Sequence, residues 1–288
     1  MHILLILLLP ILAFAVPFRA PPRGSIAPYL SGDTFRAYCD FAYDEITPYF
    51  PPTSVKRGST IFVNGDYLQK FFQRIHPQIK VPYILISHNT DMPIPGNFRN
   101  YLDDDKIIAW FTQNQDETVH PKLHTLPIAL ENRQWKPTNV QTIQRVNGMH
   151  LSKTHLVYCN FSPTSYLPER PYVQALFKDA PFVYFAERKE FDPYIEDIAS
   201  SKFVISPRGN GLDTHRLWET LYSGSFPVVK TSSLDTLYQD LPVVIVSEWT
   251  DVTEEFLHQK YEELTAKTYS YDKLYTNYWF RWIDSYKK

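Results

Sequence analysis

Arg216 and Glu219 are the side chains of this sequence best suited to bind a phosphorylated ligand. Their three-residue spacing puts them on one face of a helix. A guanidinium can bind a diphosphate, and a carboxylate can accept hydrogen bonds from the hydroxyl groups of a ribose. The pair is therefore typical of a nucleotide-sugar site, although a surface ion pair on an ordinary helix would have the same spacing.

The elements around this pair are predicted to form a strand–loop–helix–strand unit. Residues 203–205 are a short β-rich run, and residues 206–211 form a turn-rich loop with two glycines. Asp213 or Thr214 can cap the helix that follows, and residues 226–229 begin the next strand. Such a βαβ unit is typical of a parallel sheet, and the free N–H groups at the start of its helix attract phosphate.

The stretch from Phe203 to Glu219, with the run Ser-Pro-Arg-Gly-Asn-Gly-Leu-Asp-Thr-His-Arg-Leu-Trp-Glu, resembles the donor-site motif of exostosin-like glycosyltransferases (glycosyltransferase family 47 and relatives). Residues 224–229, Gly-Ser-Phe-Pro-Val-Val, extend the resemblance, and a weaker one covers most of residues 55–285. It implies an α/β fold of GT-B architecture, with two Rossmann-like domains facing across a cleft. It also implies transfer of a sugar from a nucleotide donor, usually with inversion and without an essential metal.

The resemblance further implies which residues bind the donor. Glu219 would take the ribose hydroxyls, and the residues expected at the diphosphate or sugar are Arg208, Gly209, Asn210, Gly211 and Arg216. Ligands of open α/β sheets bind outside the carboxyl ends of the strands, so two neighbouring loops supply further candidates. These are Asn160, Thr164, Arg170 and Arg188. For Thr164 and Arg170, helix capping and a solvated helix face are equally good interpretations.

Inverting transfer needs a base that removes the proton of the acceptor hydroxyl. Because the second half of the chain supplies the cations for the leaving diphosphate, we expect the base in a strand-end loop of the first half. The candidates are Asp91, Asp66 and His88, in that order. Asp66 could instead cap a helix over residues 67–75, and His88 could be a hydrogen-bonded histidine at a strand end.

Three aspartates at residues 103–105 contain a D-x-D pair, which binds manganese in the other major transferase fold. There the pair follows a hydrophobic strand, whereas here it precedes one, so a solvated turn is the better interpretation. No His/Cys cluster has zinc-ligand spacing, and the glycine-containing loop matches neither the dinucleotide nor the ATP motif. We therefore expect no metal and no resident cofactor, with the nucleotide sugar acting as a co-substrate.

The length allows one large domain or two small ones, and the resemblance implies two. The chain has 288 residues, of which 44% are hydrophobic, and its net charge of -2 gives no electrostatic case for nucleic-acid binding. We expect an N-terminal acceptor domain at residues 17–150, opened by an irregular proline-rich lead-in at 17–57. The donor domain is expected at residues 151–265, and residues 266–288 are expected to form a helix that crosses back to the first domain.

Apolar runs that alternate with amphipathic segments predict the strands and helices. The pattern in the first half fits a doubly wound sheet, and Asp251 with Glu254 could cap a helix that ends near Leu264. Strands are expected at residues 60–63, 83–87, 107–111, 125–128, 155–159, 182–185, 203–205, 226–229 and 243–246.

Residues 3–16 are an almost unbroken apolar run, shorter than the roughly 20 residues of a membrane span. A signal peptide at residues 1–16 is the leading interpretation. An uncleaved anchor, which would associate the protein with a membrane, and an apolar helix of a cytosolic protein are the alternatives. Either of the first two places the protein in the ER or Golgi lumen or outside the cell.

Two features depend on that compartment. Cys39 and Cys159 are the only cysteines, and an oxidising compartment would permit a disulfide between them. Asn160, Phe161 and Ser162 form an N-glycosylation sequon. A glycan at the edge of a cleft would obstruct a donor, so we expect Asn160 to be unmodified.

The leading hypothesis is thus a glycosyltransferase that moves a sugar, most readily from a UDP-linked donor, to a glycan or glycoprotein. One alternative is a GDP-fucose-dependent fucosyltransferase of the same fold. The other is a glycan- or nucleotide-binding protein without turnover, since a fold alone never proves an activity.

Overall fold

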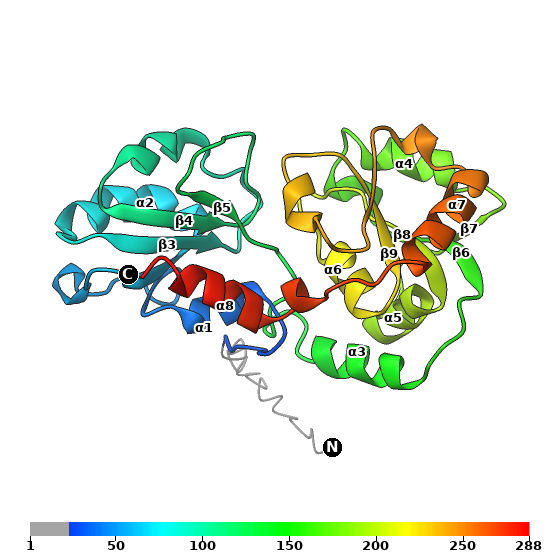
Figure 1. Ribbon diagram of the computed structural model, residues 1–288, viewed down its shortest axis with the longest axis horizontal. Coiled ribbons are helices and arrows are strands. Elements are labelled where there is room, and N and C mark those ends of the chain that lie inside the picture. Colours follow the sequence, from blue (N-terminus) through cyan, green and yellow to red (C-terminus); the bar gives the residue numbers. More distant parts are fainter. Residues whose placement is uncertain (1–22, 288) are drawn as a thin grey trace, which may run out of the picture.

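The computed structural model describes residues 23–287, so the predicted signal peptide lies outside the described residues. The chain forms two lobes that lie side by side, each built on a five-stranded parallel sheet with helices packed against it (Figure 1). In the described part of the chain, none of the helices has the length and apolar character needed to cross a membrane.

The first lobe contains a sheet whose strands lie in the same order in space as in the sequence. A doubly wound sheet reverses its strand order, so the prediction of such a sheet for the first half was wrong. The strand predicted at residues 125–128 begins and ends earlier, at Leu123–Thr125. The strands are β1 (Phe41–Tyr43), β2 (Thr60–Asn64), β3 (Tyr83–His88), β4 (Ile107–Thr112) and β5 (Leu123–Thr125).

The second lobe has the strand order β10-β9-β8-β6-β7. The chain runs from β6 to β7 in one direction and from β8 to β10 in the other, so the order reverses between β6 and β8. Ligands of open α/β sheets bind at such a switch point, outside the carboxyl ends of the two strands. The strands are β6 (His155–Cys159), β7 (Val183–Phe185), β8 (Ser201–Ile205), β9 (Phe226–Lys230) and β10 (Val244–Val246).

Eight α-helices and eight short 3-10 helices connect these strands within residues 23–287. The α-helices are α1 (Gly32–Tyr38), α2 (Leu68–Arg74), α3 (Asn139–Gly148), α4 (Arg170–Phe177), α5 (Phe191–Ala199), α6 (His215–Tyr222), α7 (Glu254–Thr265) and α8 (Thr276–Asp284). The 3-10 helices are η1 (Pro52–Ser54), η2 (Gly65–Tyr67), η3 (His76–Gln78), η4 (Gly96–Asp103), η5 (Pro163–Ser165), η6 (Asp235–Tyr238), η7 (Trp249–Asp251) and η8 (Asp272–Leu274).

Successive side chains of the first sheet face two different cores, as the alternation along a strand requires. Ile61 and Val63 pack with α2 on one face. Phe62 lies on the other face, in a core that also contains Phe35 of α1 and Trp279 of α8. The prediction of an irregular lead-in at residues 17–57 was therefore wrong for residues 32–43, because α1 covers this second face and β1 forms the edge of the sheet. Residues 17–22 of that prediction lie outside the described residues.

The last helix lies against the first lobe, although the segment before it runs along the second (Figure 1). Phe280 of α8 stacks on Tyr38 of α1 with ring centroids 4.0 Å apart, and Trp282 meets Phe111 of β4 edge to face at 5.1 Å. A single core extends from the first sheet through Leu126 and Leu130 into the second lobe. The predicted α/β fold of GT-B architecture is confirmed in that two lobes, each with a five-stranded parallel sheet and interleaved helices, lie next to each other.

Two predicted helix caps were wrong. Asn64, not Asp66, accepts the capping hydrogen bond at η2, from the Asp66 N–H at 3.0 Å. Thr253 caps α7, whereas Asp251 belongs to the preceding turn, η7.

Cys39 and Cys159 are both free thiols. The domain boundary expected at residue 150 stays a prediction. Helix α3, which precedes it, packs against α5 of the second lobe, where the Thr142 hydroxyl donates a hydrogen bond to Asp192 at 2.7 Å.

Candidate functional site

Two arginines meet at the switch point of the second sheet. The guanidinium carbons of Arg170 and Arg216 lie 5.5 and 5.9 Å from the ring centroid of Phe161, which follows β6. The Nε of Arg216 is buried and has no hydrogen-bond partner among residues 23–287. A buried donor that is left unpaired is costly, so this Nε–H keeps the capacity to donate a hydrogen bond to a ligand.

Glu219 lies one helical turn after Arg216 on α6 and is 6% exposed. Its carboxylate accepts a hydrogen bond from the Tyr194 hydroxyl at 2.9 Å instead of forming an ion pair with Arg216. Burial raises the pKa of Glu219, while His215, Tyr194 and Arg216 oppose that rise. The ion pair expected for an ordinary helix is therefore not formed, and both side chains keep capacity for a ligand.

Arg170, the first residue of α4, holds the loop after β8 in place by hydrogen bonds. Its guanidinium donates to the carbonyl oxygens of Ser162 (3.1 Å), Pro207 (3.2 Å) and Arg208 (2.8 Å). Burial, and then the nearby charge of Arg216, lower the pKa of Arg170 to about 10. Arg170 thus brings a second positive charge to the switch point, but its N–H groups are used to hold the loop.

The loop residues that the resemblance implicates have different surroundings. Arg208 lies over the ring of Tyr166, 4.3 Å from its centroid, and donates to the carbonyl of Asn210 at 2.9 Å. The Asn210 side chain is exposed. A Cβ on Gly211 would lie only 2.7 Å from the Asn114 Nδ2 of the first lobe, whereas one on Gly209 would meet nothing closer than 3.5 Å. Gly211 therefore allows a close contact between the lobes, whereas a Cβ on Gly209 would only be in ordinary van der Waals contact with the Arg170 guanidinium.

The other three candidates of the second lobe lie around this centre. The Asn160 amide is buried and donates to the Glu187 carbonyl at 2.6 Å, so it is already engaged by the protein. Thr164 is exposed and shares a hydrogen bond with Ser162. Arg188 is exposed as well.

The three candidate bases line one cavity of about 240 Å³ between the lobes. Asp91 is exposed, and the carboxylate of Asp66 accepts a hydrogen bond from the Thr90 hydroxyl at 2.6 Å. His88 is 1% exposed, its Nε2 lies 2.9 Å from the Pro127 carbonyl oxygen and its Nδ1 accepts the Asn89 N–H. Burial lowers its pKa to about 4. His88 is thus a hydrogen-bonded strand-end histidine, and the two aspartates have carboxylates able to take a proton.

Sequence reasoning missed two further groups of this cavity, Glu131 and His215. The His215 Nδ1 lies 2.7 Å from the Ala129 carbonyl oxygen, and its Nε2 lies 3.5 Å from the Glu131 carboxylate. His215 stands directly before Arg216 inside the resembling motif, which was the only signal for it. Glu131 lies in a polar connecting segment without a periodic apolar pattern, so no signal in the sequence indicated it.

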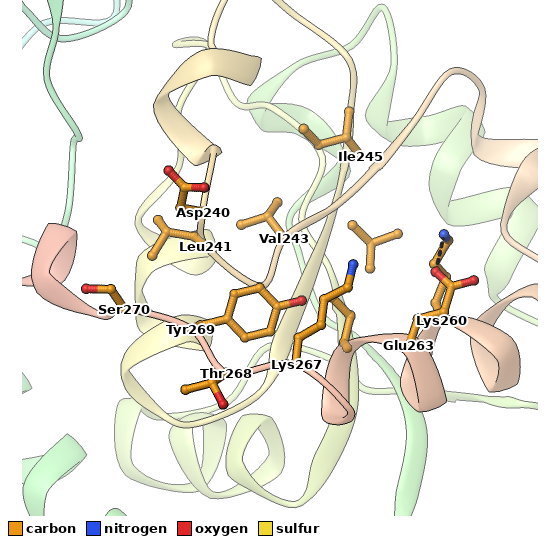
Figure 2. A pocket seen from close by; sticks show the side chains of 12 residues that line it. Asp240, Leu241, Val243, Ile245, Lys260, Glu263, Lys267, Thr268, Tyr269 and Ser270 are labelled. Carbon is orange, nitrogen blue, oxygen red and sulfur yellow. Dashed lines mark hydrogen bonds and ion pairs between the residues drawn. The ribbon is translucent and has the colours of Figure 1, made fainter.

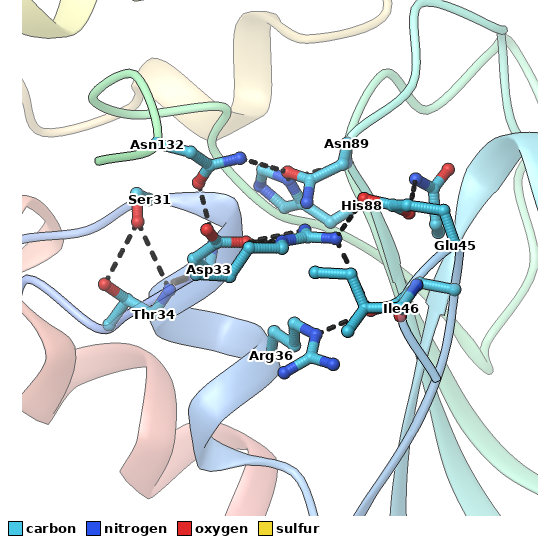
Figure 3. Close-up of polar contacts among 12 residues, drawn as sticks. Ser31, Asp33, Thr34, Arg36, Glu45, Ile46, His88, Asn89 and Asn132 are labelled. Carbon is cyan, nitrogen blue, oxygen red and sulfur yellow. Dashed lines mark hydrogen bonds and ion pairs between the residues drawn. The ribbon is translucent and has the colours of Figure 1, made fainter. Parts of the chain in front are cut away.

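Strand-end side chains of the first lobe are fixed by a polar network that reaches α1. Figure 3 shows Asn132 between Asp33 and Asn89; it accepts the Asp33 N–H at 2.8 Å and donates to the Asn89 Oδ1 at 3.1 Å. The carboxylate of Asp33 also pairs with Arg23 at 2.5 Å. The lead-in segment therefore holds one wall of the cavity in place.

A second cavity, of about 290 Å³, lies on the other side of the start of α6. Arg208 and Tyr166 line it together with Lys230 and Thr231 at the end of β9, and Glu117 comes from the first lobe. The segment 212–215 separates the two cavities, since Leu212 and Thr214 face this one and His215 faces the other.

Two other features lie apart from the candidate residues. A cavity of about 710 Å³ lies between β10 and the end of α7, where Lys267 and Tyr269 line it, and it contains none of the candidates (Figure 2). Residues 103–105 precede β4, at the edge of the sheet opposite to the strand ends that face the second lobe. Within residues 23–287, no three His, Cys, Asp or Glu side chains are grouped so as to hold a metal ion.

Comparisons with known proteins give only a distant structural likeness. No protein-family profile and no curated protein sequence matches the chain. Among solved structures, the fold is similar to that of a crystal structure of an α1,3-fucosyltransferase, with a TM-score of 0.49 and 12% sequence identity. The match covers 83% of this chain and 78% of that one.

Proposed function

We propose that this protein is a glycosyltransferase that moves a sugar from a nucleotide donor to a glycan or glycoprotein acceptor. The observation that carries the proposal is Arg216, a half-buried arginine with an unpartnered Nε at the switch point of the second sheet. Glu219 lies one turn further along the same helix and is free of an ion pair with it. Together they provide a cation for a diphosphate and a carboxylate for ribose hydroxyls.

In the proposed reaction, the acceptor hydroxyl attacks the sugar carbon as the bond to the diphosphate breaks. A first-lobe carboxylate, Asp91 or Asp66, takes the hydroxyl proton. Arg216 and the N–H groups at the start of α6 stabilise the charge that develops on the leaving diphosphate. Acceptor and donor groups thus come from different lobes, which fits a direct displacement with inversion. The proposal includes no resident cofactor.

Nucleotide binding tests the proposal most directly. We expect UDP or GDP to raise the melting temperature of the purified protein, because a ligand that binds the native state stabilises it by mass action. In the Arg216→Ala variant, the affinity should fall at least tenfold while the unliganded melting temperature changes little. Arg145→Ala is the matched control, since Arg145 is an exposed arginine of α3 that pairs with Asp192 and Glu196.

Nucleotide binding, measured together with donor turnover, distinguishes the alternative functions. Binding of UDP and turnover of a UDP-sugar support the leading hypothesis, and selective binding of GDP supports the fucosyltransferase. A donor that binds but is neither hydrolysed nor transferred to any acceptor of a broad panel would favour a binding protein. Equal affinity in wild type and Arg216→Ala would refute the assigned site. A requirement for manganese would bring residues 103–105 back into consideration.

The compartment is part of the proposal. We propose action in the ER or Golgi lumen or outside the cell, as the apolar run at residues 3–16 suggests. Secretion of a full-length chain from eukaryotic cells, with N-terminal sequencing of the product, would distinguish a cleaved signal peptide from an anchor.

A further inference from the structure

Asp213 is a buried carboxylate at the contact between the lobes, and the proposed chemistry leaves it without a role. It is 3% exposed and lies two residues before the start of α6, next to the N-cap residue Thr214. Its Oδ2 accepts the backbone N–H of Ile128, from the segment after β5, at 2.8 Å. The same oxygen accepts the Trp218 indole N–H at 2.8 Å. One oxygen atom thus joins the chain that leaves the first lobe to the helix that carries Arg216.

The second carboxylate oxygen is held entirely by the second lobe. Oδ1 accepts the Thr214 N–H at 2.9 Å and the Tyr238 hydroxyl at 3.2 Å. Four donors therefore point at one side chain that has only acceptors. A carboxylate satisfies this arrangement, whereas an amide of the same shape would turn an NH₂ group towards two of the donors.

Two residues of strained backbone face the same segment. Asn114 and Ala129 have φ angles of 53° and 57°, in the left-handed region that side-chain-bearing residues rarely adopt. The Asn114 Oδ1 accepts the Asp213 N–H at 3.0 Å, and the Ala129 carbonyl lies 2.7 Å from the His215 Nδ1. Such strain persists only where the surroundings compensate it, and here the compensating bonds come from the opposite lobe.

We propose that Asp213 is a positioning residue that fixes the start of α6 relative to the first lobe. With Asn114 and His215 it forms a lobe junction, and this junction keeps Arg216 at a set position relative to the first-lobe carboxylates. The inference rests on the proposed function for its catalytic meaning. A donor nucleotide bound by second-lobe groups alone does not need the junction, whereas transfer between lobes does.

The test compares Asp213→Asn with wild type in the full chain. Hydrogen exchange of the peptide around Ile128, followed by mass spectrometry, reports directly on the junction, because the Ile128 N–H is a donor in it. We expect this amide to exchange at least tenfold faster in the variant. The dissociation constants of UDP and GDP should stay within about twofold of wild type, while kcat for donor turnover falls at least tenfold and KM for the donor is retained.

Two further variants keep the test decisive. Trp218→Phe is the matched control, since it removes another donor to Asp213 but leaves the bond to Ile128, so exchange at Ile128 should stay slow. If Asp213→Asn does not fold, Asn114→Gly replaces it; glycine adopts the same φ freely and lacks the acceptor for the Asp213 N–H. It should also speed exchange and lower kcat with little effect on nucleotide affinity.

Two results would overturn the inference. One is slow, wild-type exchange at Ile128 in Asp213→Asn. The other is a loss of nucleotide affinity as large as in Arg216→Ala, which would make Asp213 a local support of the donor site. If wild type binds neither UDP nor GDP, the proposed function fails, but the exchange data still decide whether the junction exists.

Discussion

Replacing His124 with phenylalanine should reduce the protein's sensitivity to acid. His124 is in β5, and its ring lies 4.8 Å from Phe111, 5.2 Å from Trp282 and 5.0 Å from Tyr286, centroid to centroid. The Nε2 is buried without a hydrogen-bond partner among residues 23–287. Desolvation by these rings lowers the pKa of His124 to about 4. The folded protein therefore holds an imidazole that strongly resists protonation.

The sign of the effect follows from the order of the two pKa values. The unfolded chain has the ordinary histidine value of 6.5, so it binds a proton before the folded protein does as the pH falls. The stabilising contribution is complete above pH 6.5 and is lost as the pH falls towards 4. Between pH 7 and pH 5, these pKa values correspond to a loss of about 2 kcal/mol of unfolding free energy from this residue.

Urea denaturation at pH 7 and pH 5 measures this loss in wild type, His124→Phe and His124→Gln. Neither variant can titrate at this position, so each should lose about 2 kcal/mol less than wild type over the interval. His88 titrates in all three proteins and cancels in the comparison. At pH 7, His124→Phe should be the more stable variant, because glutamine keeps a polar group among the rings. An equal loss in wild type and His124→Phe would refute the reasoning.

Three further predictions follow from individual contacts. A Cβ on Gly32 would lie 1.7 Å from the Asn89 Oδ1, so Gly32→Ala should lower the unfolding free energy by about 2–3 kcal/mol in urea denaturation; a change within measurement error would contradict the packing. Thr253 accepts the Phe256 N–H at 3.2 Å, and Thr253→Ala should cost about 1 kcal/mol, with Ser at this position as the control that retains the cap. Burial raises the pKa of the Cys159 thiol to about 12, so a thiol reagent at pH 8 should modify it only after unfolding; rapid labelling of the native protein would contradict this.

The strands were predictable because each is indicated by an apolar run of a few consecutive residues. Apolar runs such as Ile61–Val63 and Phe203–Ile205 form buried strands in any parallel sheet, and the structure places nearly all of them within one or two residues of the expected positions. The segment at 32–43 was misjudged for the opposite reason. Helix α1 has only seven residues, and its Phe35 finds a partner in α8, almost the whole chain away.

The candidate site was predictable to the extent that one motif carries it. Arg216 and Glu219 are neighbours along a helix, so their spacing alone placed them together. Glu131 and His215 are brought together by the packing of one lobe on the other, and no local pattern encodes that contact. The residue type and position of Asp213 indicated a possible helix cap. Its bond to Ile128 was not predictable, because Ile128 lies 85 residues earlier in the chain.

Helix α8 gives the protein an unusual order of maturation during synthesis. Domains of most chains fold in turn as they leave the ribosome, the N-terminal one first. Here the first sheet is complete at Thr125, but Trp279 and Ile283, which cover one of its faces, are translated only after the whole second lobe. Until then Phe62, Ile84 and Phe111 lack that cover. We expect the nascent first lobe to remain a client of chaperones until α8 has been translated, and the second lobe to reach its native state first.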